Sequence, residues 1–489
     1  MVKQLPVRTV ETVSASIGGD IGATEALARF ATGKLVSSTD HVEQVTNALI
    51  DTVAVAIAAA PAEGTQIVNA WAAAEGGGGK ATVWTTGRKA TASMAAMVNG
   101  TSGHMLDYDD ISPTMPMHPS TVLFPALLAV AEDRGIDGAK LVQAYDVGAA
   151  TFRAVTELLP GHVHYARGWH TTSTVGRLAA VAALARLCGT PLEQARNALG
   201  IVSSLAAGSR PNFGSMTKPF HAGVAARDAV IALQLADAGF TSNPGELEAP
   251  TGFLERMGDP DLAPIGGLTE TLVERLEYWM ESWPKDWGIK RYPACYGTHR
   301  AIDAVLELRD ELAGRTPDSI RVTVHPRGME PLLPYAPQNG NQAKFSLEYA
   351  VAVAIERGAV TLQDFTDDAF ADREVRELMA IVEVVESPVP PMGDLVTREP
   401  YAAVQVRTGG EAWLGRRVDL TKGDARNPLS QAGLRNKFGD CCAAAGVSAV
   451  HSDRIFEELS VLPQGRSIAG FSKALQKTGT ENPRKVEES

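Results

Sequence analysis

The sequence predicts a mainly α-helical protein, with a large all-helical domain and a smaller α+β domain inserted into it. From about residue 20 to 270, alanine-rich segments of helical periodicity follow one another, broken by glycine or proline. Beyond about residue 268, short alternating segments stand between helix-like ones, and helical character returns after Pro428. We therefore expect a helical domain at 1–268, an α+β domain at 269–420, C-terminal helices at 421–470 that return to the first domain, and a frayed polar tail at 471–489.

Several predicted helices carry their own start and stop signals. In Thr190-Pro191-Leu192-Glu193, a capping box combines with proline at the first helical position. The segment 221–238 has apolar residues in helical register, and Gly239 is well placed to end it. Another helix is expected from Ser120, which can cap it, to Glu132. Small residues along these helices permit close packing.

The second domain is predicted from its alternating segments. Residues 320–324 and 403–406 alternate with period two, as strands do. The second of these leads through Gly409-Gly410 to a further run at 411–420, a pattern typical of a hairpin. Helix-like runs at 297–313 and 346–358 complete the predicted α+β domain.

Composition and charge exclude several classes of protein. The 489 residues carry a formal net charge of −12, which argues against a nucleic-acid partner because such proteins need cationic surfaces. The four cysteines have no spacing typical of a disulfide framework, a zinc site or an iron–sulfur cluster. The first 30 residues lack an apolar run of signal length, and the longest apolar stretch, 53–61, is too short to span a membrane. We expect a cytoplasmic protein that binds no membrane.

The densest set of proton-transfer groups lies at 103–120. His104 and Asp107 are three residues apart and would share a face of a helical turn. His118 precedes Pro119, which favours an extended backbone just before the next helix. Asp109 and Asp110 can either take part in proton transfer or simply cap a turn. The segment is predicted to be an active-site loop.

Two further histidines stand at predicted helix starts. His170 precedes a run of hydroxyl residues, so it is either an active-site group or a half-buried residue beside a helix cap. Lys218 and His221 occur together at the next such start. Cations are disfavoured at a helix N-terminus, so a bound anion explains Lys218 better than the helix does. An exposed loop lysine is the alternative.

The second domain contributes a third set of polar residues. Lys290 and Arg291 are adjacent cations that could hold carboxylates, and Cys295 follows them. Nothing near Cys295 in the sequence marks it as an activated nucleophile, so packing is its commoner role. Tyr335 would reach the other groups only if this domain closes over the first.

Together these groups indicate acid–base chemistry on an anion. The sequence has no metal-ligand spacing and no glycine-rich nucleotide or nucleophile-elbow motif, so we expect neither metal nor cofactor. Histidine catalysis on a substrate held by lysine and arginine suits proton abstraction next to a carboxylate. Elimination or reprotonation would then follow.

These motifs, in this order, resemble the MmgE/PrpD family, which includes 2-methylcitrate dehydratase, cis-aconitate decarboxylase and iminodisuccinate epimerase. The resemblance extends from about residue 25 to 465. It rests on Asn99-Gly100, Asp107-Tyr108-Asp109-Asp110, His118-Pro119-Ser120, Gly168-Trp169-His170, Lys218 with His221-Ala222-Gly223, and Lys290-Arg291-Tyr292-Pro293 with His299. Asp51-Thr52-Val53 and the segment 423–428 also agree.

The resemblance implies a homodimer whose α+β domain acts as a lid over an active site between the domains. The residues expected to be catalytic are His118, His170, Asp107 and Tyr335. Those expected to bind substrate are Lys218, Lys290, Arg291, His221, His104 and Cys295. Two departures from the animal decarboxylases stand out: a longer loop from Asp110 to His118, and Cys295 in place of a histidine.

The expected function is dehydration of a 2-methylcitrate-like substrate by a lyase that needs no cofactor. Dehydratases are among the commonest characterised members of the family, which favours this reaction. Decarboxylation of cis-aconitate and epimerisation of an iminodisuccinate-type substrate are alternatives that use the same groups. A carboxylate-binding protein without catalytic activity is an alternative of a different class.

Overall fold

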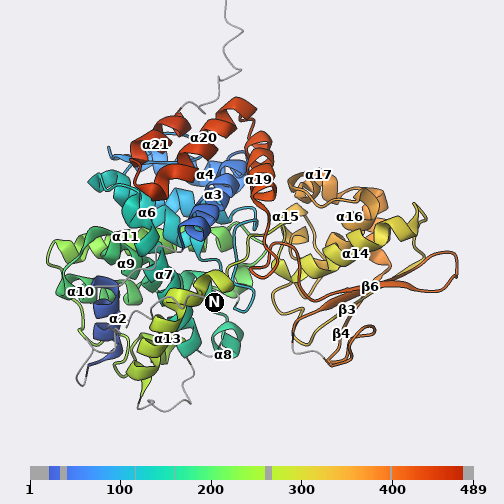
Figure 1. The fold of residues 1–489 in the computed structure, drawn as a ribbon, viewed down its shortest axis with the longest axis horizontal. Helices are drawn as coiled ribbons and strands as arrows, with labels where there is room; N and C mark the ends of the chain where they lie inside the picture. The colour runs from blue at the N-terminus through green and yellow to red at the C-terminus, as the bar shows by residue number, and fades with distance from the viewer. Residues whose placement is uncertain are drawn as a thin grey trace, which may run out of the picture.

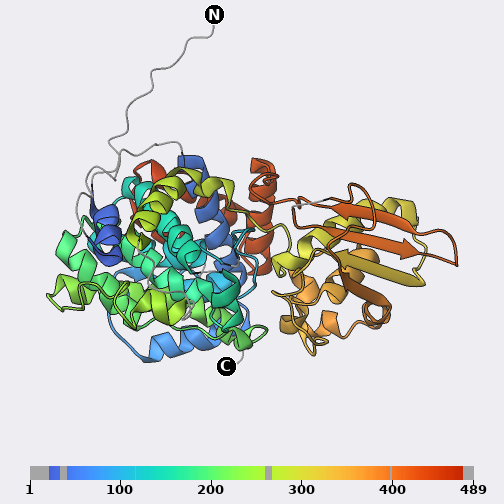
Figure 2. The ribbon, with the colours of Figure 1, turned by 90° about the horizontal axis from the view of Figure 1, so that it is seen from below.

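The structure is a computed structural model that describes residues 21–33, 41–115, 117–159, 161–258, 267–396 and 399–476. It confirms a mainly α protein with a smaller α+β domain. Figure 1 shows the helical domain on the left and the α+β domain on the right, and Figure 2 shows the same division from below. Each domain has its own apolar core.

The helical domain is built mainly from the first half of the chain. Its helices there are α2 (Ala23–Thr32), α3 (Val42–Ala58), α4 (Glu63–Ala74), α5 (Ala92–His104), α6 (Ser120–Arg134), α7 (Ala139–Leu158), α8 (Gly161–Ala166), α9 (Thr171–Cys188), α10 (Leu192–Ser204), α11 (Thr217–Asp237), α12 (Phe253–Met257) and α13 (Leu268–Ser282). A small hairpin, β1 (Ala81–Thr82) with β2 (Lys89–Ala90), precedes α5.

Helices α5 and α11 pack backbone to backbone. A Cβ atom added at Gly223 would lie 2.2 Å from the carbonyl oxygen of Met97, and one at Gly100 would lie 2.9 Å from the Cα of Gly223. Only glycine fits at such a crossing. The contact places the end of α5, with His104, beside the start of α11, with Lys218.

The α+β domain has one four-stranded sheet with helices against it. Its elements are the 3-10 helix η4 (Tyr296–Thr298), α14 (His299–Leu312), β3 (Ser319–Val324), α15 (Gly340–Ala343), α16 (Leu347–Arg357), η5 (Leu362–Phe365), α17 (Asp367–Phe370), α18 (Arg373–Ala380), β4 (Val382–Glu386), β5 (Ala402–Arg407) and β6 (Leu414–Val418). The strand order is β4-β3-β5-β6, and only β3 and β4 are parallel. The predicted hairpin is confirmed as β5–β6, with Gly409 and Gly410 at positive φ.

The last helices return to the helical domain, as Figure 1 shows in red. They are α19 (Gln431–Ala444), α20 (Ala449–Val461) and α21 (Ile468–Gln476). Their apolar residues, including Phe438 and Phe471, belong to the first core. The prediction of a frayed tail from residue 471 is therefore wrong up to 476, and residues 477–489 lie outside the described part of the chain.

Three local predictions need correction. The domain boundary predicted at 269 is too early, because α13 and Trp283 pack into the first core and the second core begins at Tyr292. Helix α10 begins at Leu192 with no side-chain cap from Thr190. Helix α11 begins at Thr217 rather than 221, which puts Lys218 in its first turn. Strand β4 was not predicted.

Among the described residues, no single helix is long and apolar enough to cross a membrane. Helices α3 and α4 pass that test of length and composition only as a pair, and they meet at an angle of 90°.

The contact between α5 and α11 gives a stability prediction. Gly223→Ala should lower the free energy of unfolding by about 1–3 kcal/mol, because the new methyl group forces two backbones apart. Urea unfolding of the full chain measures this. The control is Gly439→Ala on α19, where an added Cβ meets no atom within 4 Å. That change should raise stability by about 0.5–1 kcal/mol, and equal effects at both positions would contradict the packing argument.

Candidate active site at the domain junction

A cavity of about 390 Å³ lies where the two domains meet. The helical domain contributes Asp107, His118, Tyr165, His170, Phe213 and Lys218 to its wall. The chain that leads into the second domain and that domain itself contribute Lys290, Cys295, Tyr296, Arg300, His325, Arg327 and Phe345. Six of the ten residues predicted as site residues therefore line one cavity: Asp107, His118, His170, Lys218, Lys290 and Cys295.

Asp107 is the centre of a buried ion triad. Its carboxylate contacts the Lys218 ammonium through Oδ1, and its Oδ2 lies 3.0 Å from Lys290 Nζ. Lys290 also donates to the Asp107 carbonyl oxygen at 2.7 Å. The two lysines hold the pKa of Asp107 well below its usual range despite burial. The backbone of Asp107 has φ 51°, a left-handed conformation that aspartate tolerates better than most residues.

Helix α19 anchors the backbone on both sides of this triad. The Lys437 ammonium donates to the carbonyl oxygens of Tyr108 and Lys290, each at 2.8 Å, and pairs with Asp51 at 2.5 Å. Lys437 was not predicted as a site residue. The available signal was Asp51, the one charged residue in the largely apolar stretch 48–58 of α3, because a buried carboxylate needs a cationic or hydrogen-bonding partner.

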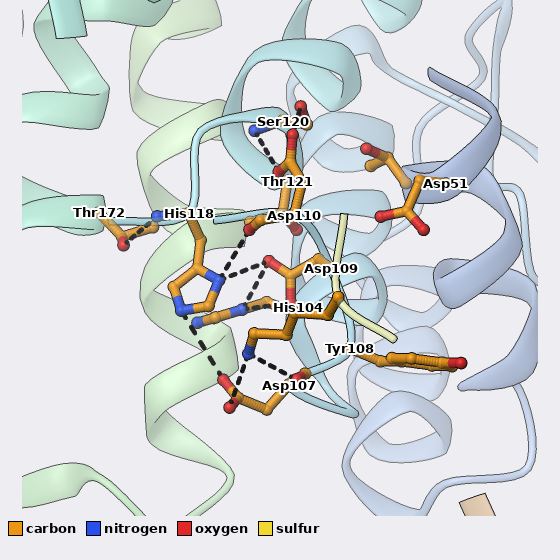
Figure 3. A network of polar contacts seen from close by, with 12 residues as sticks. Asp51, His104, Asp107, Tyr108, Asp109, Asp110, His118, Ser120, Thr121 and Thr172 are labelled. Atoms are coloured by element: carbon orange, nitrogen blue, oxygen red, sulfur yellow. Dashed lines mark hydrogen bonds and ion pairs between the residues drawn. The ribbon is translucent and has the colours of Figure 1, made fainter. Parts of the chain in front are cut away.

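Asp109 is held between two histidines (Figure 3). Its carboxylate oxygens lie 2.9 and 3.0 Å from His104 Nδ1, and Oδ2 lies 3.1 Å from His118 Nδ1. The expected pairing of His104 with Asp107 on one helical face is wrong, because α5 ends at His104. Asp109 therefore does more than cap a turn, and the histidines hold its pKa well below the usual range. His104 lies behind His118, outside the cavity wall.

His118 presents one ring nitrogen toward Asp107 and the cavity. Its Nδ1 lies 3.1 Å from both the Asp109 carboxylate and the Asp110 carbonyl oxygen. Both neighbours accept only, so Nδ1 carries the hydrogen and Nε2 keeps a lone pair in the neutral ring. Nε2 lies 3.8 Å from Asp107 Oδ1. Burial lowers the pKa of His118, so the ring is a neutral base at neutral pH.

His170 and His221 form a second histidine pair. Their Nδ1 atoms are 3.1 Å apart, so one ring donates and the other accepts. Burial lowers the pKa of both, that of His221 to about 4, and the nearby Lys218 charge adds to the effect. His170 is the member of the pair that lines the cavity, while His221 lies behind it.

The loop between Asp110 and His118 is fastened at both ends. Asp110 accepts from the Ser120 hydroxyl and from its N–H, so it caps α6 in place of Ser120 itself. Ser112 and Thr114 donate to Asp286 at 2.5 and 2.6 Å. Pro113, Thr114 and Met115 then contribute to the cavity wall.

Three further predicted site residues, Cys295, Arg291 and Tyr335, differ in whether they line the cavity. Cys295 lines the cavity, and burial raises the pKa of its thiol, which therefore stays protonated. The Arg291 side chain is 47% exposed and turns toward Asp303 at 3.6 Å. Tyr335 is 54% exposed. Neither Arg291 nor Tyr335 contributes to the wall of this cavity, so the structure does not bring them to the site.

The cavity wall carries an excess of positive charge. Its cations are Lys218, Lys290, Arg300 and Arg327, and its carboxylates are Asp107 and Glu330. The lowered pKa values of His118 and His170 leave those rings neutral. A wall of this composition favours an anionic ligand.

His104, Asp107, Asp109 and His118 offer ligand atoms within 4.8 Å of one another, as in a metal site. The hydrogen-bond pattern does not favour a metal ion there. Both Nδ1 atoms point at Asp109, and two ammonium groups contact Asp107. A metal ion would have to displace or repel those ammonium groups.

Comparison with known proteins identifies the family. Residues 25–264 match the MmgE/PrpD N-terminal domain, and residues 292–461 match the MmgE/PrpD C-terminal domain. The chain belongs to the MmgE/PrpD family. The first match ends at residue 264 and the second begins at 292, where the second core also begins. Helix α13 lies between the two matched regions.

Known relatives include cis-aconitate decarboxylases. The chain is 28% identical over 357 residues to the protein from Homo sapiens. The aligned region covers 70% of this chain and 71% of the human protein. It is 27% identical over 357 residues to the protein from Mus musculus, with 70% of each chain covered. The protein from Aspergillus terreus is 25% identical over 250 residues, or 47% of this chain and 48% of that one.

The pairing of Asp109 with His118 predicts a pH effect. If neutral His118 is the base, activity falls as pH drops through its pKa, which lies below 6.5. The Asp109 charge raises that pKa, so Asp109→Asn should move the acid limb of kcat/KM to lower pH. The variant should also lower kcat by roughly 10- to 100-fold, because a weaker base transfers protons more slowly.

The matched control for this test is Asp368→Asn, an exposed aspartate on α17. Its pH profile should coincide with that of the parent protein. An acid limb that stays in place in Asp109→Asn, or moves to higher pH, would show that His118 is not the group titrating.

Proposed function

We propose that this enzyme is an MmgE/PrpD-type lyase that removes the proton next to a carboxylate of a small di- or tricarboxylate. The specific reaction we propose is dehydration of a 2-methylcitrate-like hydroxy acid. The family assignment supports a lyase acting on a carboxylate. The observation that carries the finer proposal is the neutral His118 ring, with its Nε2 lone pair on the side of Asp107 and the two lysines.

The lysines suit the charge that develops during proton removal. When His118 takes the proton, the electron pair of the broken carbon–hydrogen bond moves toward the adjacent carboxylate, which gains negative charge. Lys218 and Lys290 are held by Asp107 before substrate binds, so they need little rearrangement to stabilise that charge. The carbon–carbon double bond then forms as the carbon–oxygen bond breaks. The hydroxyl group leaves as water with a proton from one of the ammonium groups.

The cavity wall also limits access of water to the reacting atoms. Phe213 and Phe345 come from different domains, and their ring centroids are 6.3 Å apart. Lys218 Nζ lies 5.3 Å from the first ring and 5.0 Å from the second. The two rings therefore lie against the lysine, and an apolar surrounding strengthens its interaction with a bound carboxylate.

Decarboxylation of cis-aconitate is the second candidate, and the relatives favour it. Loss of carbon dioxide leaves an electron pair that extends toward a carboxylate, so the same lysines would stabilise the intermediate. This reaction then needs a proton donor to carbon rather than a base. The protonated thiol of Cys295, which lines the cavity, is a group able to fill that role.

Proton NMR in D₂O distinguishes these reactions. The purified enzyme is incubated separately with 2-methylcitrate, cis-aconitate and an iminodisuccinate. We expect alkene signals and loss of the parent signals with 2-methylcitrate. Itaconate signals from cis-aconitate would instead establish the second candidate. Deuterium incorporation without elimination would indicate epimerisation. No change in any of the three samples would refute the proposed lyase activity on these substrates.

Substitution of the base tests the mechanism separately. His118→Gln should lower kcat by about 100- to 10,000-fold, the usual contribution of a general base. KM should change by only a few fold, since Lys218 and Lys290 remain in place. Steady-state kinetics on whichever substrate reacts gives both values, and circular dichroism checks the fold. A variant that kept more than a tenth of the parent kcat would show that another group removes the proton.

A further inference from the structure

Arg300 is a buried cation in the wall that the second domain contributes to the cavity. The residue lies in the first turn of α14 and is 6% exposed. Its Nε donates to the Asp419 carbonyl oxygen at 3.0 Å, which fixes the guanidinium plane. Within the described part of the chain, its two terminal nitrogens donate to no acceptor and no carboxylate pairs with it.

The other cations of the wall are already paired. Lys218 and Lys290 contact Asp107, and Arg327 donates to both oxygens of Glu330 at 2.7 and 2.9 Å. Arg300 differs from them because it contacts only neutral groups within the described part of the chain: the carbonyl at its Nε and the Tyr296 ring, whose centroid lies 5.5 Å from its Cζ. An unpaired charge in a buried position is costly, and a cation in the first turn of a helix is further disfavoured. Both costs fall when an anion binds.

His325 stands near Arg300 on the same wall. Its Nδ1 lies 3.3 Å from the Tyr401 carbonyl oxygen, so that nitrogen donates and Nε2 remains available. Burial lowers the pKa of this ring and the positive charge of Arg300 lowers it further, which places the two groups within electrostatic reach. Both residues line the cavity. Fork-shaped guanidinium groups suit carboxylates because two parallel N–H groups can donate to two oxygens.

We propose that Arg300, with His325 beside it, binds the substrate carboxylate that lies farthest from His118. This lid carboxylate subsite rests on the proposed function, since it assumes that the cavity holds a polycarboxylate. Lys218 and Lys290 receive the carboxylate next to the reacting carbon, and Arg300 receives a carboxylate at the other end. The enzyme then selects substrates with carboxylates at both ends, and a substrate without the distal carboxylate loses most of its affinity.

A binding measurement tests the subsite without relying on turnover. Isothermal titration calorimetry compares tricarballylate with butyrate, which has one carboxylate, on the full-length protein. The parent protein should bind tricarballylate at least about tenfold more tightly than butyrate. Arg300→Met should lose most of that preference, and Arg300→Lys should keep part of it. The control is Arg309→Met, an exposed arginine on the same helix, which should bind both ligands as the parent does.

The outcomes separate the subsite from the proposed function. An unchanged preference in Arg300→Met, or no measurable binding of tricarballylate to the parent, would overturn the subsite even if 2-methylcitrate is dehydrated. If Arg300→Met loses the preference but the parent protein turns over none of the NMR substrates, the subsite stands and the proposed lyase activity is refuted. Thermal unfolding of each variant checks folding. If Arg300→Met unfolds, the parent-like fold of Arg300→Lys still allows the comparison, because a weaker and less directional pairing predicts an intermediate preference.

Discussion

The pairing of Asp107 with two lysines is the interaction on which the rest of the site depends. Three distant segments meet there: the loop after α5, the first turn of α11 with Lys218, and the connection to the second domain with Lys290. Each of these side chains is at most 5% exposed. Breaking one member of such a buried set leaves an uncompensated charge, so the three segments are held together more strictly than apolar packing alone would hold them. The candidate active site consequently lies at the domain junction.

The backbone around this triad is shaped to permit it. Asp107 follows the end of α5 by three residues and has a left-handed backbone. Gly100 and Gly223 bring α5 and α11 close enough for Lys218 to reach it. On the opposite side, Lys437 binds the carbonyl oxygens of Tyr108 and Lys290 and thus fixes both partners from α19. This explains why the C-terminal helices return to the first domain: they hold the backbone of the site as well as fill the core.

The sequence predicted the fold class and many helix ends because those features follow from local periodicity and capping signals. Other features depend on packing. The sequence pattern of α13 predicts a helix but does not tell which of the two cores it packs against, so the domain boundary at 269 was placed too early. Asp109 had two possible roles, and only the folded loop shows it between two histidines. Arg300 was missed although the argument used for Lys218, a cation at a helix start, applies equally to it. Arg291 was predicted from its neighbour Lys290 and Tyr335 from the family resemblance, and neither source tells which way a side chain turns.

In the proposed mechanism, the charges that bind substrate also set the protonation of the base. Burial lowers the pKa of His118, the charges of Lys218 and Lys290 lower it further, and the Asp109 charge raises it. Electrostatic interactions are reciprocal, so an anionic substrate that offsets the lysine charges raises the pKa of His118 by the same interaction. Before substrate binds, the ring is held neutral and weakly basic. Once carboxylates lie beside the lysines, the ring becomes a stronger base at the moment when a proton has to be removed. In this proposed mechanism the cationic wall contributes twice. It first attracts the anionic substrate, and the bound substrate then offsets the lysine charges that lower the pKa of His118.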